Sequence, residues 1–338
     1  MKLMTIFAAT AVAIFSAGSP QFAAADVSEI KVPLGAGGFG FLPLHMMKKF
    51  ELVEKQAEAA GIDLAVDWSN IGGPSAMNEA LLSGAASFIS AGPPSFLTLW
   101  DKTRSNIQVK GVAAMSTMPM FLNTNSPDIQ SLDDISGDLK MGVTSVKVSI
   151  PSIIMQMYAR EKYGDDQIFR FDPQTVSMAH PDSLISLVSR NGAIVAHYAS
   201  QPFAQRELKE EGIRTIQNSD DVMGGPTTFT MISTTTKFHD ENPKVYAAFV
   251  AALKEAQDMI AADPETALDV LIESMGGDSA LDRADLMAIL TDPSTTYTTV
   301  PANVMKYATF MHDIGSLKAV PATLDDLFFE SAEIDGGN

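Results

Sequence analysis

The stretch from Trp68 to Ser95 constrains the fold of this chain more than any other. Its residues, WSNIGGPSAMNEALLSGAASFISAGPPS, predict the end of a strand, a glycine loop, a helix, a second strand over Ala85 to Ser90 and a second turn. Pro74 suits the first turn of the helix, and Gly84 suits its end. Both loops would follow parallel strands, where an open α/β sheet binds its ligand, and both lead into a helix N-terminus that suits an anion. An ordinary βαβ crossover without a ligand is the alternative explanation.

A second set of the same elements occurs further along the chain. Residues 75–94 and 182–202 each predict a helix, a terminal glycine, a short apolar strand and a proline-containing loop. There is little residue identity between them, so the repeat is one of architecture. In the second copy the strand is predicted at Ala193 to Ala196 and the loop at His197 to Pro202. The sequence therefore predicts the α/β class, with two similar units.

The remaining elements place these units in separate domains. Strands are predicted at Val109 to Ala114, Met120 to Asn125 and Ile168 to Phe171, and a helix at Leu44 to Ala60. Thr228 to Thr234 is predicted to return the chain to the first domain. The expected organisation is a signal peptide at 1–25, domain I at 26–115 plus 235–338, and domain II at 116–234.

The N-terminus resembles an export signal. Lys2 precedes the apolar run Thr5 to Ser16, and three alanines before Asp26 form a small-residue cleavage site. Cleavage is expected near Ala25/Asp26. The chain has no cysteine, which excludes disulfides, thiol catalysis and a lipid-bearing N-terminal cysteine. We therefore expect a periplasmic protein without a lipid anchor, and a monomer.

Charge and motifs exclude several functions. The formal net charge of −18 argues against binding nucleic acid or anionic membrane surfaces. The five histidines lack zinc-site spacing, and neither a phosphate-binding P-loop nor a G-x-S-x-G elbow occurs. Gly35 to Gly40 matches G-x-G-x-x-G, but Asp67 lies too far on to serve as its ribose-binding acid. We expect no catalytic residues, no metal and no cofactor.

The order of several short segments resembles a known family. They are Ser75 to Gly92, Ile129 to Gly137, Gly142 to Ser145, Ala199 to Phe203 and Phe238 to Ala256. The chain resembles periplasmic substrate-binding proteins of the nitrate/taurine/alkanesulfonate ABC uptake family, which also includes pyrimidine-precursor binders. The resemblance implies a two-lobed, type II periplasmic-binding-protein fold with two crossover strands and the ligand in the interdomain cleft. It also implies delivery of the ligand to an inner-membrane permease coupled to a cytoplasmic ATPase.

The family's ligand-contacting loops map onto five segments of this chain: Gly38 to Phe41, Trp68 to Ser75, Gly92-Pro93, Thr144 to Ser149 and His197 to Ser200. The predicted ligand-binding residues in them are Gly38, Phe39, Gly40, Trp68, Ser69, Gly73, Ser75, Gly92, Pro93, Thr144, Ser145, Lys147, Ser149, His197 and Tyr198. For His197 and Lys147, a core histidine and a solvated surface lysine are the alternatives.

The hydroxyl-rich loops, the helix N-termini and Lys147 favour a small organic anion, such as a sulfonate or a carboxylate. Nitrate fits less well, because the predicted aromatic residues would leave a small ion poorly filled. A neutral or cationic heteroaromatic, such as a pyrimidine vitamin precursor, is the alternative, with Asp67 as the one candidate acid. Two other classes stay open. One is a pyrimidine-synthase-like enzyme, which the lack of cysteine disfavours, and the other is a receptor or chaperone-like protein.

Overall fold

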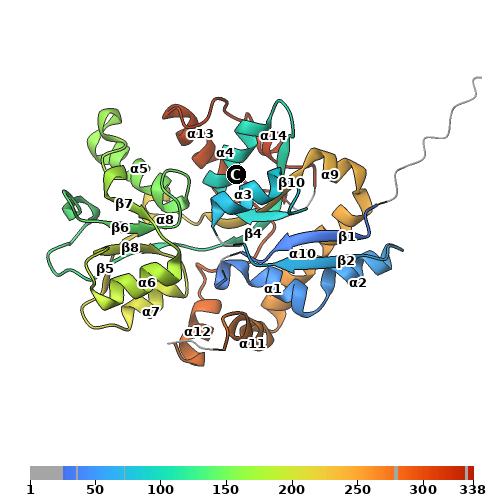
Figure 1. Ribbon diagram of the computed structural model, residues 1–338, viewed down its shortest axis with the longest axis horizontal. Coiled ribbons are helices and arrows are strands. Elements are labelled where there is room, and N and C mark those ends of the chain that lie inside the picture. The colour runs from blue at the N-terminus through green and yellow to red at the C-terminus, as the bar shows by residue number, and fades with distance from the viewer. Residues whose placement is uncertain (1–25, 36, 72, 278–280, 332–333) are drawn as a thin grey trace, which may run out of the picture.

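The computed structural model describes residues 26–35, 37–71, 73–277, 281–331 and 334–338. The predicted signal peptide lies outside the described residues. The chain forms two lobes that each contain a β-sheet covered by helices (Figure 1). This confirms the predicted α/β class.

In the first lobe, β1 and β2 pair in parallel, and β10 lies between β3 and β4, antiparallel to both. These strands are β1 (Glu29–Pro33), β2 (Ala65–Ser69), β3 (Ile89–Ala91), β4 (Val109–Thr117) and β10 (Thr228–Thr235). The helices of this lobe are α1 (Leu42–Lys49), α2 (Leu52–Ala59), α3 (Pro74–Leu82), α4 (Pro93–Thr103), α9 (Thr236–Glu241), α10 (Pro243–Ala262) and α11 (Pro264–Ser274).

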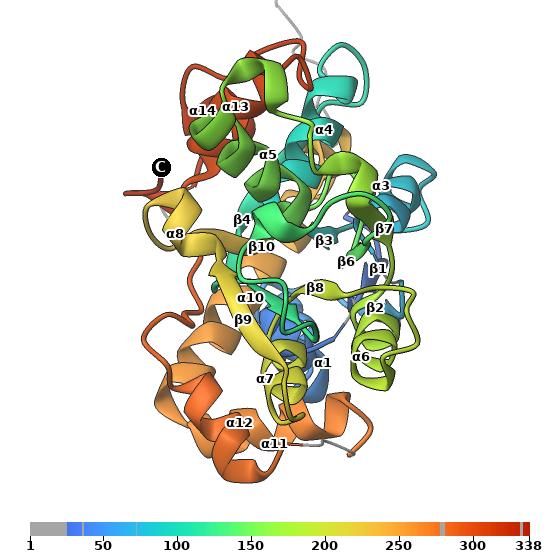
Figure 2. The same ribbon diagram turned by 90° about the vertical axis from the view of Figure 1, so that its left-hand side faces the viewer.

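The second lobe is built on one sheet with the strand order β7-β6-β8-β5-β9. Its strands are β5 (Phe121–Thr124), β6 (Met141–Val143), β7 (Thr175–Ser177), β8 (Ala196–Ala199) and β9 (Arg214–Asn218). Its helices are α5 (Ile150–Tyr163), α6 (His180–Ser189), α7 (Phe203–Leu208) and α8 (Ser219–Met223). Both views show α5 on one face of this sheet and α6 and α7 on the other (Figures 1 and 2).

The chain passes between the lobes through two long, buried strands. β4 leads through Met118-Pro119-Met120 into β5, and α8 leads back into β10. Every residue of β10 except Thr235 is buried, and one hydrophobic core continues from the first lobe through these strands into the second. The two crossings therefore fix the lobes side by side, as the predicted crossover strands require.

The C-terminal helices contact both lobes. They are α12 (Arg283–Leu290), α13 (Val304–Asp313) and α14 (Leu324–Leu327). Lys209, just after α7, pairs with Asp285 of α12 at 2.6 Å, and Arg160 of α5 pairs with Asp313 of α13 at 3.1 Å. These exposed ion pairs contribute little stability individually, but they lie on opposite sides of the junction (Figure 2).

The structure corrects several predicted elements. The helix predicted over Leu44 to Ala60 is two helices, because Glu51 adopts a left-handed conformation with φ 51° between α1 and α2. Residues 168–171 form turns instead of a strand, and the strand of this region is β7. No helix in the described ranges is long and apolar enough to cross a membrane.

Two further strands differ from the prediction. β8 spans Ala196–Ala199 instead of Ala193 to Ala196, so His197 and Tyr198 lie within a buried strand and not in a loop. β3 is shorter than predicted and begins at Ile89. All three residues of β3 pair with β10, and all four residues of β8 pair with β5.

The first lobe contains a histidine that resists protonation. His45 on α1 has a buried Nε2 with no hydrogen-bond partner among the described residues, and burial, reinforced by Lys48, lowers the pKa of His45 to about 4. The unfolded chain takes up this proton below about pH 6.5 and the folded chain does not, so acid lowers the free energy of unfolding. Between pH 7 and 5, urea denaturation should show that the wild type loses about 2 kcal/mol more than His45→Gln. An equal loss in both proteins would contradict this assignment.

Candidate functional site

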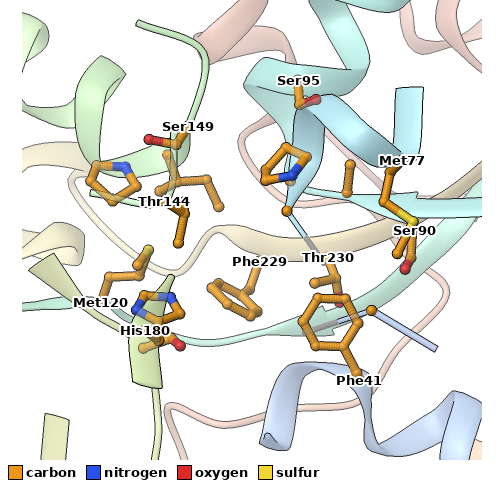
Figure 3. Close-up of a pocket in the computed structure, with 18 of the residues that line it drawn as sticks. Phe41, Met77, Ser90, Ser95, Met120, Thr144, Ser149, His180, Phe229 and Thr230 are labelled. Atoms are coloured by element: carbon orange, nitrogen blue, oxygen red, sulfur yellow. The ribbon is translucent and has the colours of Figure 1, made fainter. Parts of the chain in front are cut away.

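A cavity of about 80 Å³ lies between the two lobes. Figure 3 shows Met120, Thr144, Ser149 and His180 on one side of it and Met77, Ser90 and Ser95 on the other, with Phe229 between them. Such a volume suits a small compound and not a polymer. The cavity is thus a candidate ligand site between the two lobes.

The first lobe contributes the segments that follow three strands. Gly35, Gly37 and Phe41 come after β1, with Phe41 at the end of the short 3-10 helix η1 (Phe39–Phe41). Gly73, at the N-terminus of α3, comes after β2, and Gly92, at the N-terminus of α4, comes after β3. All three segments lie at the carboxyl ends of strands, which is where open α/β sheets hold their ligands.

The second lobe contributes three segments of the same kind. Thr144 and Ser149 lie between β6 and α5, His180 begins α6 after β7, and Ser200 follows β8. The crossings add Met120 before β5 and Phe229 within β10. The edge of the Phe229 ring faces Phe41, with ring centroids 6.5 Å apart at 75°. The middle of the cavity is therefore lined by apolar groups.

Four helices of eight residues or more, α3, α4, α5 and α6, begin at the cavity. Their N-terminal ends carry partial positive charge, which favours an anion. Each of the four also has proline at its first or second position, which removes N–H donors. In α4 the first two N–H groups, those of Ser95 and Phe96, both donate to the Gly92 carbonyl. The helices therefore supply a positive field and few hydrogen-bond donors.

Hydroxyl groups and one imidazole supply the remaining polarity. Ser90 is 2% exposed, and its Oγ has no hydrogen-bond partner within the described part of the chain. Ser95 Oγ receives a hydrogen bond from Asn78 Nδ2 at 3.0 Å, which leaves its own proton free for a ligand. The residues lining the cavity include no Lys, Arg, Asp or Glu among those the structure describes. The cavity is thus polar at a few points and carries no formal charge.

His180 connects the cavity to the interior of the second lobe. Its Nδ1 lies 2.9 Å from His197 Nε2, and His197 Nδ1 lies 2.5 Å from Glu207 Oε1. Burial lowers the pKa of His197 to about 3, and burial and then His197 lower the pKa of His180 well below its ordinary value. Burial raises the pKa of Glu207 to about 8, against a smaller opposite effect of the hydrogen bond from Asn123. All three groups thus favour their uncharged forms at neutral pH.

Each of the five loops predicted from the sequence contributes at least one residue to the cavity wall, but the individual residues divide into two groups. Gly73, Gly92, Thr144 and Ser149 line the cavity. The other predicted residues lie outside its wall, and the role of each as a ligand contact stays a prediction.

The two glycines next to Phe39 contact protein instead of the cavity. A Cβ on Gly38 would lie 3.0 Å from the Gln201 carbonyl oxygen, and one on Gly40 would lie 2.2 Å from the Phe229 ring. Phe39 itself is buried, and its carbonyl accepts a hydrogen bond from Tyr297. These residues shape the wall behind Phe229.

The remaining first-lobe residues lie on β2 and at the starts of helices. Trp68 packs against the core from β2, and Ser69, at the end of β2, accepts a hydrogen bond from the Leu34 N–H. Ser75 is exposed on α3, and Pro93 is buried at the start of α4. Asp67 on β2 is also exposed.

In the second lobe, Lys147 is exposed and adopts φ 70°, and its N–H donates to Ser152 Oγ. Ser145 is buried, and its carbonyl accepts from Ser149 Oγ at 2.6 Å. His197 and Tyr198 are fully buried in β8, and Tyr198 donates to Gln217. The predicted counter-charge, Lys147, is therefore not part of the cavity wall.

Sequence reasoning missed Ser90, His180 and Phe229. Ser90 lies within a strand, two residues before the predicted loop at Gly92, and Phe229 lies within β10. For His180 a signal was present, because this residue begins a predicted helix after a predicted strand. Because the preceding strand was predicted at Ile168 to Phe171 and not at β7, His180 was not recognised as following a strand end.

Comparison with known proteins adds a family. The family model described as NMT1/THI5 like matches residues 58–267, which is more than half of the chain. The chain belongs to the NMT1/THI5-like family. Comparison of this NMT1/THI5-like chain with curated protein sequences gave no match.

Solved structures confirm the fold of this NMT1/THI5-like protein. The alkanesulfonate-binding protein SsuA from Xanthomonas axonopodis pv. citri, bound to MOPS, superposes with a TM-score of 0.68 at 14% identity, over 90% of this chain and 99% of that one. The periplasmic aliphatic sulphonate binding protein SsuA from Escherichia coli gives 0.61 at 16%, over 93% and 96%. The periplasmic nitrate-binding protein NrtA from Synechocystis PCC 6803 gives 0.67 at 14%, over 89% and 84%. The fold and the family resemblance predicted from the sequence are confirmed.

The two lobes are in close contact at Gly92. A Cβ on this residue would lie 2.9 Å from Ile150 Cδ1 of the second lobe and 3.2 Å from the Phe229 carbonyl oxygen. We expect Gly92→Ala to shift the lobes apart, because the added Cβ meets the Ile150 side chain of α5 while the Phe229 carbonyl oxygen, which is backbone, crowds it as well. Small-angle X-ray scattering should show a larger radius of gyration, and Ile150→Ala added to Gly92→Ala should restore the wild-type value. An unchanged radius in Gly92→Ala would contradict close contact of the lobes at this point.

Proposed function

We propose that this protein is the periplasmic solute-binding component of an ABC importer, with the cavity between its lobes as the ligand site. The observation that supports this is the convergence of six strand ends and four helix N-termini, from both lobes, on one small cavity. Lobes joined by two crossings can close on a ligand and open to release it. The solved structures with this fold include proteins described as sulfonate and nitrate binders. An inner-membrane permease with its cytoplasmic ATPase is the proposed partner.

The proposed ligand is a small organic anion with an apolar part, such as a sulfonate or a carboxylate. Helix N-termini and hydroxyl donors favour an anionic head, and Met77, Phe41 and Phe229 provide apolar surface for the remainder. Because Lys147 lies outside the wall, the head would be held without a formal counter-charge. Nitrate would leave the apolar wall unfilled, and a cation would find no acid in the described wall.

A neutral heteroaromatic is the second candidate for the ligand. The absence of formal charge in the described wall and the adjacent Phe41 and Phe229 rings favour it. Such a ligand would fill the apolar middle of the cavity and use the same hydroxyls. It differs from the first candidate in needing no positive field, so the compound class that stabilises the protein more distinguishes the two candidates.

The ligand class can be tested by thermal unfolding with a panel of compounds. A ligand that binds only the folded protein raises its melting temperature by mass action. We expect an alkanesulfonate or a short carboxylate to raise it more than nitrate, an aminopyrimidine or a quaternary amine does. Chemical conversion of any of these compounds by the pure protein would contradict a binding-only role, and stabilisation by the aminopyrimidine alone would favour the second candidate.

Ser90 and Ser183 form a matched pair for locating the site. Both are buried serines whose Oγ lacks a hydrogen-bond partner among the described residues, but Ser90 lines the cavity and Ser183 lies against β6, near Gly142. Calorimetry with the compound that stabilises the protein most should show that Ser90→Ala weakens binding by about 1 kcal/mol, a factor of about five. Ser183→Ala should leave the affinity unchanged. An equal effect of the two substitutions on affinity would show that Ser90 does not contact the ligand.

A further inference from the structure

His180, His197 and Glu207 are joined by hydrogen bonds in a single line, and the His180 end of this line reaches the cavity. His180 is 6% exposed and stacks on Phe203, with ring centroids 5.3 Å apart, while His197 and Glu207 are fully buried. His180 Nε2 has no partner among the described residues, and the His180 ring lines the cavity (Figure 3). Whether His180 Nε2 carries a hydrogen therefore decides whether the ligand meets a hydrogen-bond donor or an acceptor at this point.

The inner end of the line has a fixed direction. Asn123 Nδ2 donates to the Ala204 carbonyl at 3.1 Å and to Glu207 Oε2 at 2.8 Å. Asn123 Oδ1 accepts from Thr215 Oγ1 at 2.6 Å. The amide of Asn123 therefore cannot be reversed, and Glu207 Oε2 is always an acceptor. Any proton on Glu207 lies on Oε1 and faces His197.

We infer that this line of side chains is a proton-coupled switch, in which the proton of Glu207 decides whether His180 offers the cavity a hydrogen-bond donor or an acceptor. Each contact holds one proton. With Glu207 protonated, Oε1 donates to His197 Nδ1, His197 Nε2 donates to His180 Nδ1, and His180 Nε2 carries a hydrogen. Wherever the additional proton lies along the line, Nε2 of His180 remains a donor.

Loss of that proton reverses the line. The carboxylate then requires an N–H from His197 Nδ1, and His197 Nε2 becomes an acceptor. His180 must then donate through Nδ1, because otherwise the lone pairs of His180 Nδ1 and His197 Nε2 would face each other. His180 Nε2 is left as a bare lone pair that repels an oxyanion. The raised pKa of Glu207, about 8, places this change just above neutral pH.

Several charged groups lie around Glu207, and one of them, Arg206, has a buried Nε without a hydrogen-bond partner among the described residues. Those on the elements packed against it are Arg206, Lys209, Glu210, Arg214, Asp182 and Asp285. Lys209 pairs with Asp285, and Arg214 donates to carbonyl groups near Pro127. Within the described residues, none of the six side chains forms a hydrogen bond or ion pair with the side chain of His180, His197 or Glu207, and the N–H of Glu210 donates to the backbone carbonyl of Glu207 at 3.0 Å. The raised pKa of Glu207 is thus caused by burial, against a smaller opposite effect of the hydrogen bond from Asn123.

Nuclear magnetic resonance of histidine labelled with ¹⁵N tests the switch without any ligand. In the wild type below pH 7, both imidazoles should carry hydrogen on Nε2, and above about pH 9 both should carry it on Nδ1. In Glu207→Gln the oxygen of the amide must accept from Asn123, so its N–H faces His197 and the Nε2–H form should persist at high pH. Glu210→Gln, an exposed matched control, should behave like the wild type. An unchanged tautomer in the wild type, or the same change in Glu207→Gln, would overturn the inference.

The effect on binding rests on the proposed function and is measured with ethanesulfonate as the probe. One proton with a pKa of about 8 predicts that affinity falls about tenfold between pH 7 and 9 in the wild type and stays constant in Glu207→Gln. A tautomer change without a change in affinity would overturn the role of the switch in recognition. Absence of binding by every anion in the panel would count against the proposed function and not against the switch, because the tautomers are read in the free protein.

Discussion

One buried set of oxygen atoms holds together the three segments that shape the cavity. The hydroxyls of Ser116 on β4 and Thr230 on β10 lie 2.6 Å apart, and they lie 3.1 and 2.7 Å from the carbonyl oxygen of Gly40. These bonds join the two crossing strands to the loop after β1. Because Gly40 has no side chain, the Phe229 ring can lie against its Cα and form the wall of the cavity. A buried polar set of this kind is costly unless it is complete, so it specifies one arrangement.

The cavity and the outer surface have opposite electrostatic character. The chain as a whole has a formal net charge of −18, whereas the described cavity wall has no formal charge and faces four positive helix ends. The prolines at these helix ends replace N–H donors with apolar ring surface. Selectivity would then depend on a few hydroxyls and on His180, and the apolar wall would reject ligands that are entirely polar.

The sequence predicted the architecture better than the individual contacts. Glycine and proline mark the ends of strands and the starts of helices, so the loops around Gly73, Gly92 and Thr144 could be placed at the site. Glycine and proline positions do not show which way a neighbouring side chain points. The sequence predicted that His197 and Tyr198 follow a strand, because the apolar run ends at Ala196. Both residues instead continue β8, and their polar atoms are hydrogen-bonded to Glu207 and Gln217.

Other differences have similarly local causes. Nothing in the residues around Glu51 signals the break between α1 and α2, since no glycine or proline occurs there. Both helices pack against α10, a long-range contact that the local sequence does not contain. Lys147 is in the predicted loop, but it is exposed, has a left-handed backbone and is not part of the cavity wall. Ser90 and Phe229 lie within strands. The arrangement of the two lobes decides which face of a strand meets the other lobe, and no local sequence pattern contains this information.

The central claim is that the cavity between the lobes holds a small organic anion by helix ends, hydroxyls and His180, without a formal counter-charge. A crystal structure of the protein with its most stabilising ligand tests this most directly. We predict a ligand that lies against Phe41 and Phe229, with its oxyanion next to Ser90, Ser95 or His180 and no Lys or Arg side chain in contact. A ligand bound outside the cavity, or an oxyanion paired with Lys147, would contradict it.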